Sequence, residues 1–278
     1  MKKIVLIITT IILLLIILYA RFIGTSGLKI NEYKIVNSNI TDEYHGLKVV
    51  HITDIHYGST INNKKLENIV EKINFIKPDI VVMTGDLIDE KFEYNSEEII
   101  KNLSNIKAKL GKYAISGNHD YPLENYNELL KASGFINVDN TYELIYNNTI
   151  NPIIISGIST NIKDTTDMSI KTKEYDEYIS SQDSNPLYSI LLMHEPDYID
   201  NLNIDNYDLV LAGHSHNGQI NIPLLKNLYL PDGCDKYMNG HYLIKNTNLY
   251  VSNGLGTSGL RFRLFSKPSI NLYRITNK

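Results

Sequence analysis

Apolar and polar positions along the chain follow two patterns, short apolar runs and longer stretches with helical spacing. The short runs predict strands, because polar or glycine-rich residues follow each of them. They cover residues 29–36, 47–53, 80–83, 113–116, 152–158, 189–193 and 208–212. Apolar residues three and four apart predict helices over 62–75, 96–110, 124–132 and 170–179. Because strands and helices alternate, the pattern predicts an α/β fold.

The last part of the chain, from residue 220 to 275, has a different rhythm. Short β-like runs at 242–244, 249–252 and 270–275 alternate with glycine-rich turns. This pattern predicts antiparallel strands.

The first 23 residues differ in composition from everything that follows. Ile4 to Ala20 carry no charge, Lys2 and Lys3 precede them, and Arg21 follows. As a helix this run spans about 25 Å, and the residues up to Ile23 extend it toward the thickness of a bilayer core. It predicts an uncleaved single-pass membrane anchor, with a cleaved signal peptide as the alternative. The two lysines favour a cytoplasmic N-terminus and an extracytoplasmic domain.

Charge and length limit what the rest of the chain can be. All 31 acidic residues but only 24 of the 27 basic ones lie after residue 23, so that part has a net charge of −7. Such a charge is unlike that of nucleic-acid-binding domains, and we expect no nucleic-acid partner. The single cysteine, Cys234, excludes cysteine-based metal sites. We expect an anchor at 1–23, a linker and first strand at 24–46, and one domain at 47–278.

Five polar blocks follow one another along the chain, most of them directly after a predicted strand. They are Asp54-Ile55-His56, Gly85-Asp86-Leu87-Ile88-Asp89, Gly117-Asn118-His119-Asp120, His194 and Gly213-His214-Ser215-His216. On an extended strand the first and third residues of Asp-x-His share one face. Ligands bind outside the carboxyl ends of strands in open α/β sheets, so we expect one site. Its oxygen and imidazole groups predict two divalent metal ions.

The blocks divide into ligands and groups that handle protons. Asp86 is the best candidate for a shared ligand, because a carboxylate has two oxygens. Asn118 adds a neutral oxygen. The other candidate ligands are Asp54, His56, His194, His214 and His216. Mn²⁺ is our first choice for this mixed set, Fe and Zn²⁺ also fit, and Mg²⁺ fits less well.

The charge of the predicted site indicates its substrate. Two divalent cations less Asp54, Asp86 and a hydroxide leave about one positive charge, which suits a phosphate ester. His119 adjoins a candidate ligand and is placed to protonate the leaving oxygen, and Asp89 is the candidate to orient it. We therefore predict hydrolysis by water activated between two metals.

The blocks D-x-H, G-D-x-x-D, G-N-H-D, H and G-H-x-H resemble those of the calcineurin-like metallophosphoesterase superfamily, over about residues 47–220. The resemblance implies an αββα sandwich of two mixed sheets flanked by helices, which here follows the N-terminal transmembrane helix. It implies one metal at Asp54, His56, Asp86 and His216, and another at Asp86, Asn118, His194 and His214. It also implies that His119 is the catalytic acid.

Two further segments resemble a narrower, membrane-anchored bacterial branch that includes UDP-2,3-diacylglucosamine diphosphatase-like enzymes. They are His214-Ser215-His216-Asn217-Gly218-Gln219 and Asn253-Gly254-Leu255-Gly256-Thr257-Ser258. Asn217 stands where that branch has a second glycine, and Ser269 where it commonly has Glu. The resemblance implies hydrolysis of a phosphoester or diphosphate bond, with a lipid-linked substrate as one option.

Two other interpretations of the chain remain open. A non-catalytic metal-binding scaffold of the same fold would keep the ligands without the reaction. A metal-dependent amidohydrolase also uses H-x-H, but there the pair opens the barrel, whereas His214 and His216 come late in this chain.

Overall fold

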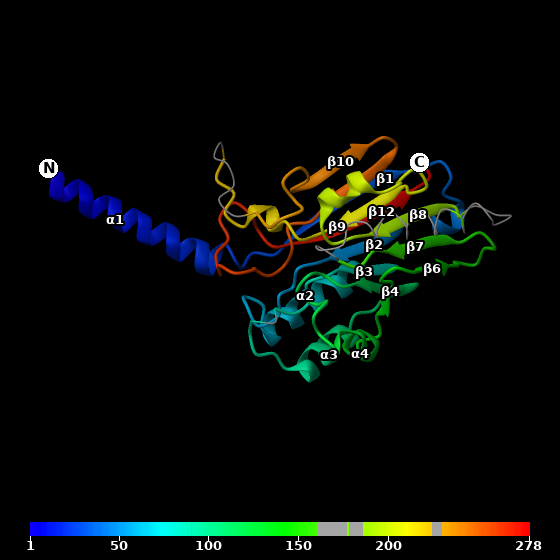
Figure 1. Cartoon of the computed structure of the whole chain (residues 1–278), viewed down its shortest axis with the longest axis horizontal. Coiled ribbons are helices and arrows are strands. Elements are labelled where there is room, and N and C mark those ends of the chain that lie inside the picture. The colour runs from blue at the N-terminus through cyan, green and yellow to red at the C-terminus, as the bar shows by residue number, and fades with distance from the viewer. Residues whose placement is uncertain (90, 161–176, 178–185, 224–229) are drawn as a thin grey trace.

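The computed structural model describes residues 1–89, 91–160, 177, 186–223 and 230–278. Two mixed sheets pack face to face, and the described α-helices of the domain cover the outer face of the first sheet (Figure 1). The helix predicted over 170–179 lies, except for residue 177, outside the described residues. The α/β sandwich predicted from the sequence is thus confirmed.

The first sheet has four parallel strands at its centre and one edge. In spatial order it contains β1 (Lys29–Val36), β12 (Ser269–Thr276), β2 (Leu47–Ile52), β3 (Ile80–Thr84), β4 (Gly111–Ile115) and β5 (Ile136–Asn137). Strands β2 to β5 are parallel. Strand β12 lies between β1, to which it is parallel, and β2, to which it is antiparallel.

Three helices connect the strands of this sheet, α2 (Asn63–Ile76), α3 (Ser96–Ser104) and α4 (Tyr126–Ala132). The side chain of Asn62 caps α2 by accepting a hydrogen bond from the backbone of Lys65. Helix α3 is shorter than predicted, because the side chain of Asn105 donates to the Lys101 carbonyl and ends the helix.

The second sheet is also mixed. Its four central strands are parallel, and an antiparallel strand lies at each edge. In spatial order it contains β10 (Gly240–Ile244), β11 (Thr247–Val251), β9 (Leu209–Ala212), β8 (Tyr188–Leu192), β7 (Ile153–Gly157) and β6 (Tyr142–Ile145). The antiparallel prediction for the last part of the chain is right for β10 on β11 and for β12 on β2. It is wrong for β11 on β9 and for β12 on β1, both of which are parallel. Alternating polarity marks a strand but does not fix the direction of its partner.

The apolar side chains form three layers. Val49 and Val82 of the first sheet meet Ile190 and Leu211 of the second in the core between the sheets. A second layer lies between the first sheet and α2, α3 and α4. A third covers the outer face of the second sheet, packed there by the 3₁₀ helix η3 (Pro196–Asn201). Because the central strands of both sheets are buried on both faces, polar groups gather at the strand ends.

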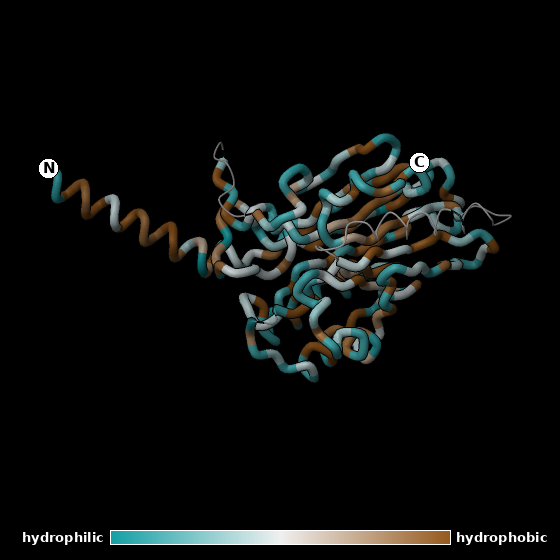
Figure 2. Tube along the Cα trace, viewed as in Figure 1, coloured by the Kyte–Doolittle hydropathy of each residue, from teal (hydrophilic) through white to brown (hydrophobic). Residues whose placement is uncertain are grey.

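The N-terminal helix stands away from the domain. Helix α1 (Lys2–Leu18) continues into the π-helical segment η1 (Tyr19–Ile23), and its surface is apolar and exposed (Figures 1 and 2). Its 22 residues are long and apolar enough to cross a membrane. The backbone N–H of Arg263 donates to the Ala20 carbonyl at 2.9 Å, which ties the helix end to the domain.

The acid stability of the domain depends on a histidine that the site does not use. His51 is fully buried, its Nε2 lies 2.8 Å from Oγ1 of Thr84, and burial lowers its pKa from 6.5 to about 3. Unfolding therefore takes up a proton below pH 6.5, so the free energy of unfolding falls as the pH falls. Between pH 7 and pH 5 we expect the free energy of unfolding of His51→Gln to fall by about 2 kcal/mol less than that of the wild type.

Urea unfolding of the metal-free full chain, followed by near-ultraviolet circular dichroism of its 20 tyrosines, measures this difference. His241→Gln, at an exposed position of β10, is the control and should lose as much stability as the wild type. An equal loss in His51→Gln would contradict the assignment.

Candidate metal centre

The loops after β2 and β3 run side by side at the end of the first sheet. The backbone N–H groups of Asp54 and His56 donate to the carbonyls of Gly85 and Asp86, each at 3.0 Å. The expectation that Asp54 and His56 leave one face of an extended strand is wrong. Strand β2 ends at Ile52, and both residues have left-handed φ angles.

Left-handed backbone recurs through the predicted ligands. Five of the seven have φ between 44° and 67°: Asp54, His56, Asp86, His214 and His216. Such angles are uncommon for residues with a Cβ and cost of order 1–3 kcal/mol each. Their concentration here indicates that the strand-end turns are shaped to bring side chains together.

Asp86 lies at the centre of the site. Its Oδ2 is 3.2 Å from Nε2 of His194 and 3.4 Å from Nε2 of His56. Its Oδ1 accepts a hydrogen bond of 3.0 Å from the backbone N–H of His119. Gly117 makes this approach possible, because a Cβ there would collide with Oδ1 and lie 2.5 Å from the Asp86 nitrogen.

The candidate ligands converge in three groups, in each of which one atom per residue lies within 4.8 Å of the others. The groups are Asp54, His56 and His216; His56, Asp86 and His119; and Asp86, His194 and His214. All are buried. Across these groups, Nε2 of His56 lies 3.1 Å from Nε2 of His216. The structure therefore brings together six of the seven predicted ligands around Asp86.

Two of the imidazoles have their lone pairs directed into the site. His194 Nδ1 lies 2.6 Å from the Thr84 carbonyl, and His214 Nε2 lies 2.9 Å from the Asp232 carbonyl. A carbonyl only accepts, so both of these nitrogens carry a proton. In the neutral form of each ring, which is the form that binds a metal, the lone pairs then lie on His194 Nε2 and His214 Nδ1, which face one another at 3.1 Å. Fixing the tautomer in this way is typical of metal-binding histidines.

The seventh predicted ligand, Asn118, lines a cavity of 290 Å³ together with Asp86, His119, His214 and His216. Its Oδ1 is buried and accepts no hydrogen bond within the described part of the chain. A buried carbonyl oxygen without a donor is costly, so a cation at this position would satisfy it. The donor set of the site and this oxygen both fit bound metal ions.

His119 and Asp89 both lie close to His56. Nδ1 of His119 is 4.0 Å from Oδ1 of Asp89, and Nδ1 of His56 is 3.8 Å from Oδ2. Nε2 of His119 faces the cavity and lies 3.5 Å from Oγ of Ser258. Asp89 is thus placed between the two imidazoles.

Burial decides the protonation of the histidines. It lowers the pKa of His56 and of His214 to about 3, which leaves both rings neutral at pH 7. His194 differs, because the Asp86 carboxylate raises the pKa of His194 against the opposing effect of burial. Burial also opposes ionisation of Asp86, but His194 and His56 together hold the pKa of Asp86 well below its usual range.

Four residues of the site were not predicted from the sequence. Asp120 accepts hydrogen bonds from the backbone of Leu87, Ile88 and Gly117 and so joins two of the loops. The signal for it was present, since Asp120 closes the third block. Glu195 is buried beside His194, and Lys91 lines the 290 Å³ cavity.

Arg263 is the fourth residue, and it links the site to the N-terminal helix. It is fully buried, with Nη2 3.1 Å from Nδ1 of His216 and 2.8 Å from the Asn253 carbonyl. Nη1 donates to the Ser266 carbonyl at 3.1 Å. Since its backbone N–H binds Ala20, one residue contacts both the end of the apolar helix and a candidate ligand.

Comparison with known proteins agrees with this geometry. The sequence profile of the calcineurin-like phosphoesterases matches residues 47–218. The chain is similar to the uncharacterised metallophosphoesterase YkuE of Bacillus subtilis, with 32% identity over 92% of this chain and 88% of that protein. It is 29% identical to the UDP-2,3-diacylglucosamine pyrophosphatase LpxG of Chlamydia trachomatis, over 83% of this chain and 84% of that protein. A transmembrane protein with a metallophosphoesterase domain from Danio rerio is also 29% identical, over 87% of this chain and 56% of that protein.

The close approach at Gly117 gives a test of the site. We expect Gly117→Ala to displace the Asp86 carboxylate and to weaken metal binding by about 10- to 100-fold. Titration with Mn²⁺, with bound metal counted by mass spectrometry, measures the change. Gly46→Ala strains a left-handed backbone, φ +77°, but places nothing within 4 Å of the added Cβ, so it controls for general strain and should bind metal as the wild type does. Unchanged affinity in Gly117→Ala would contradict the central position of Asp86.

Proposed function

This chain belongs to the calcineurin-like phosphoesterase family, and from that premise we propose that it is a membrane-anchored, dinuclear-metal phosphoesterase acting on a lipid-linked substrate. Metal-dependent phosphoester hydrolysis follows from the family itself. The number of metals, the anchor and the kind of substrate are our proposal.

The position of Asp86 is the observation that supports the proposal of a dinuclear centre. Its carboxylate belongs to two ligand groups, one with His56 and one with His194 and His214. We assign one metal to Asp54, His56, Asp86 and His216, and the other to Asp86, Asn118, His194 and His214. Both sets offer oxygen and imidazole only, for which Mn²⁺ is our first choice.

The bound metals would supply Lewis-acid stabilisation of the phosphate and a nucleophile at neutral pH. The protein supplies the proton for the leaving group. His119 faces the cavity through Nε2, and Asp89 lies on the side of its Nδ1. A carboxylate there can orient the ring so that Nε2 is presented to the leaving oxygen, as a general acid requires. Lys91, on the same cavity, would hold a phosphate oxygen.

The role of His119 predicts a dependence on the leaving group. With Mn²⁺ present, His119→Ala should slow hydrolysis of a diester with alkyl leaving groups, such as glycerophosphocholine, by about 100-fold or more. The rate of hydrolysis of bis-p-nitrophenyl phosphate should fall much less, because p-nitrophenolate leaves without a proton. Release of nitrophenol and of choline measures the two reactions.

His241→Ala is the matched control for this experiment, because His241 is an exposed histidine on β10. Equal losses for both leaving groups would contradict the acid role of His119. A wild-type chain that binds metal but releases neither product would defeat the catalytic proposal and favour a non-catalytic scaffold.

The path from the apolar helix to the ligands supports action at a membrane. Ala20 lies in the helix, Arg263 binds its carbonyl, and the Arg263 side chain lies 3.1 Å from His216. A helix that spans the bilayer would hold the cavity close to the lipid surface. The similarity to LpxG, named for a diacylated diphosphate substrate, agrees with this proposal. From the positions of Lys2 and Lys3 we propose a cytoplasmic N-terminus and an extracytoplasmic domain.

A comparison of acylated and deacylated substrates tests the lipid proposal. In proteoliposomes, the full chain should hydrolyse a nucleotide diphosphate-linked acylated sugar with a kcat/KM about 100-fold above that for its deacylated counterpart. Anchoring enzyme and lipid in one membrane raises the local substrate concentration, which is the physical reason. Liberated nucleotide monophosphate is the readout, and bis-p-nitrophenyl phosphate serves as the soluble reference. Equal values for both forms would contradict a lipid substrate.

A further inference from the structure

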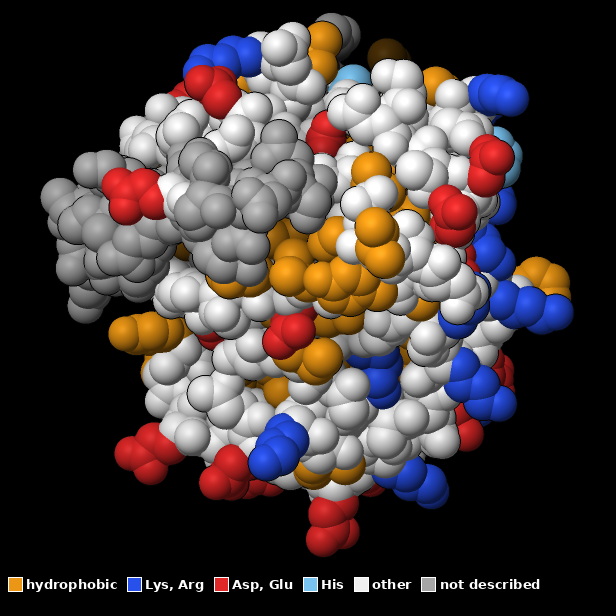
Figure 3. All heavy atoms as spheres, turned by 90° about the vertical axis from the view of Figure 1, so that its right-hand side faces the viewer, with side chains coloured by type: hydrophobic (Ala, Val, Ile, Leu, Met, Phe, Trp, Pro, Cys, Tyr) orange, Lys and Arg blue, Asp and Glu red, His pale blue; other side chains and the backbone are white. Residues whose placement is uncertain are grey.

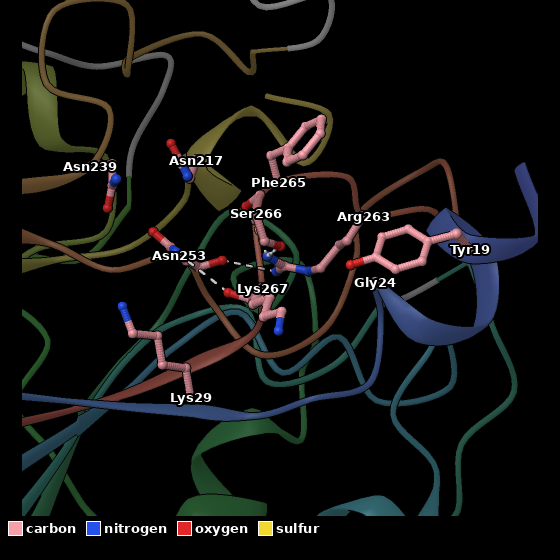
Figure 4. A pocket seen from close by; sticks show the side chains of 10 residues that line it. All are labelled: Tyr19, Gly24, Lys29, Asn217, Asn239, Asn253, Arg263, Phe265, Ser266 and Lys267. Atoms are coloured by element: carbon pink, nitrogen blue, oxygen red, sulfur yellow. Dashed lines mark hydrogen bonds between the residues drawn. The ribbon is translucent and has the colours of Figure 1, made fainter. Parts of the chain in front are cut away.

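A second cavity lies where the apolar helix joins the domain. It has a volume of 380 Å³ and opens beside Tyr19 of η1 and the loop that carries Arg263 (Figure 4). Its lining residues are Tyr19, Gly24, Lys29, Asn217, Asn239, Asn253, Arg263, Phe265, Ser266 and Lys267. None of them lines the 290 Å³ cavity of the metal centre. The two cavities are therefore separate, and they are linked by the contact of 3.1 Å between Arg263, which lines one, and His216, which lines the other.

The chemistry of the lining is that of a site for an anion. Lys29 and Lys267 contribute ammonium groups, three asparagines contribute amides, and the described lining residues include no carboxylate. A neighbouring cavity of 370 Å³, lined by Lys65, Lys72 and residues 25–28, also has no carboxylate. In contrast, acidic and basic side chains are interspersed on the end of the domain that faces away from α1 (Figure 3). The described residues that line these two cavities thus carry positive charge without a carboxylate, although the chain as a whole is acidic.

The walls of this cavity are held by buried contacts. Arg263 is saturated by the carbonyls of Asn253, Gly256 and Ser266, so it fixes the loop rather than offering free donors. Gly24 packs directly on the loop, since a Cβ there would collide with the Arg263 carbonyl. The two lysines and the asparagines therefore face a space whose shape is set by the domain.

The position of the cavity indicates the source of its ligand. Tyr19 belongs to the apolar helix, and the ring of Phe265, which is 65% exposed, stands beside the cavity. Aromatic side chains next to lysines are typical of the interface between lipid tails and headgroups. With α1 spanning the bilayer, as proposed above, a ligand in this cavity would lie at the depth of the lipid phosphates.

We propose that this cavity binds the phosphodiester anion of a membrane lipid headgroup, at a site separate from the metal centre. Lys29 and Lys267 pair with the phosphate, and Asn217, Asn239 and Asn253 donate to the headgroup hydroxyls. This site goes beyond the proposed reaction, because it needs neither metal nor turnover. Its occupation holds the domain against the leaflet with the metal cavity beside it.

Native mass spectrometry of the metal-free full chain tests this proposal. The chain is released from uncharged detergent micelles that contain equal amounts of phosphatidylglycerol and phosphatidylcholine. We expect singly lipid-bound protein to carry phosphatidylglycerol over phosphatidylcholine by about tenfold, as charge pairing at a membrane surface favours anionic lipid. In Lys29→Gln/Lys267→Gln this preference should disappear, and in Lys29→Arg/Lys267→Arg it should remain.

Lys34→Gln/Lys107→Gln is the matched control, because it removes the same charge at exposed positions that line neither cavity. It should keep the wild-type preference. No preference in the wild type, or an undiminished one in Lys29→Gln/Lys267→Gln, would overturn the proposal. Since chelator is present throughout, this outcome is independent of any failure of the proposed reaction.

A competition with glycerol 3-phosphate identifies the source of the phosphate. If millimolar glycerol 3-phosphate leaves the bound phosphatidylglycerol in place, the site takes the lipid. Displacement that depends on Lys29 and Lys267 supports the same site but assigns it to soluble phosphate esters as well.

Discussion

The structure depends on keeping the carboxylate of Asp86 buried, ionised and shared. Taking an unpaired carboxylate out of water costs several kcal/mol, so the surrounding chain must compensate it. The His119 backbone N–H and the rings of His56 and His194 do so. These groups come from separate loops, and each loop follows a different strand. Burial of one charge therefore requires both sheets to end at the same place.

This requirement explains the unusual backbone of the site. A strand end that simply continued outward would point its side chains into solvent. Left-handed turns at Asp54, Asp86 and His214 redirect the chain so that neighbouring loops hydrogen-bond to each other. Each such turn is costly on its own, and the hydrogen bonds between the loops offset the strain. Gly117 completes the arrangement, because only a residue without a Cβ leaves room for the Asp86 carboxylate.

Much of this architecture was readable from the sequence, for a physical reason. Buried strands are short apolar runs, and the five polar blocks follow them at the edge where loops converge. Strands β5 and β6 were not predicted, because they are short and lie at sheet edges. Arg263 was not predicted as a site residue because its partners are distant in sequence, at His216 and at Ala20. The assignment of particular ligands to particular metals remains a prediction.

Net charge was informative about the whole domain and misleading about one face of it. A net charge of −7 on the residues after Ile23 argues against electrostatic adhesion of the domain to an anionic surface. Interactions between exposed charges are screened beyond about 10 Å, so the local arrangement decides what a surface binds. At the helix end, Lys29 and Lys267 line one cavity, and its described lining residues include no carboxylate. Arg263 contacts both Ala20 and His216, so a single residue connects the helix end of the domain to a candidate metal ligand.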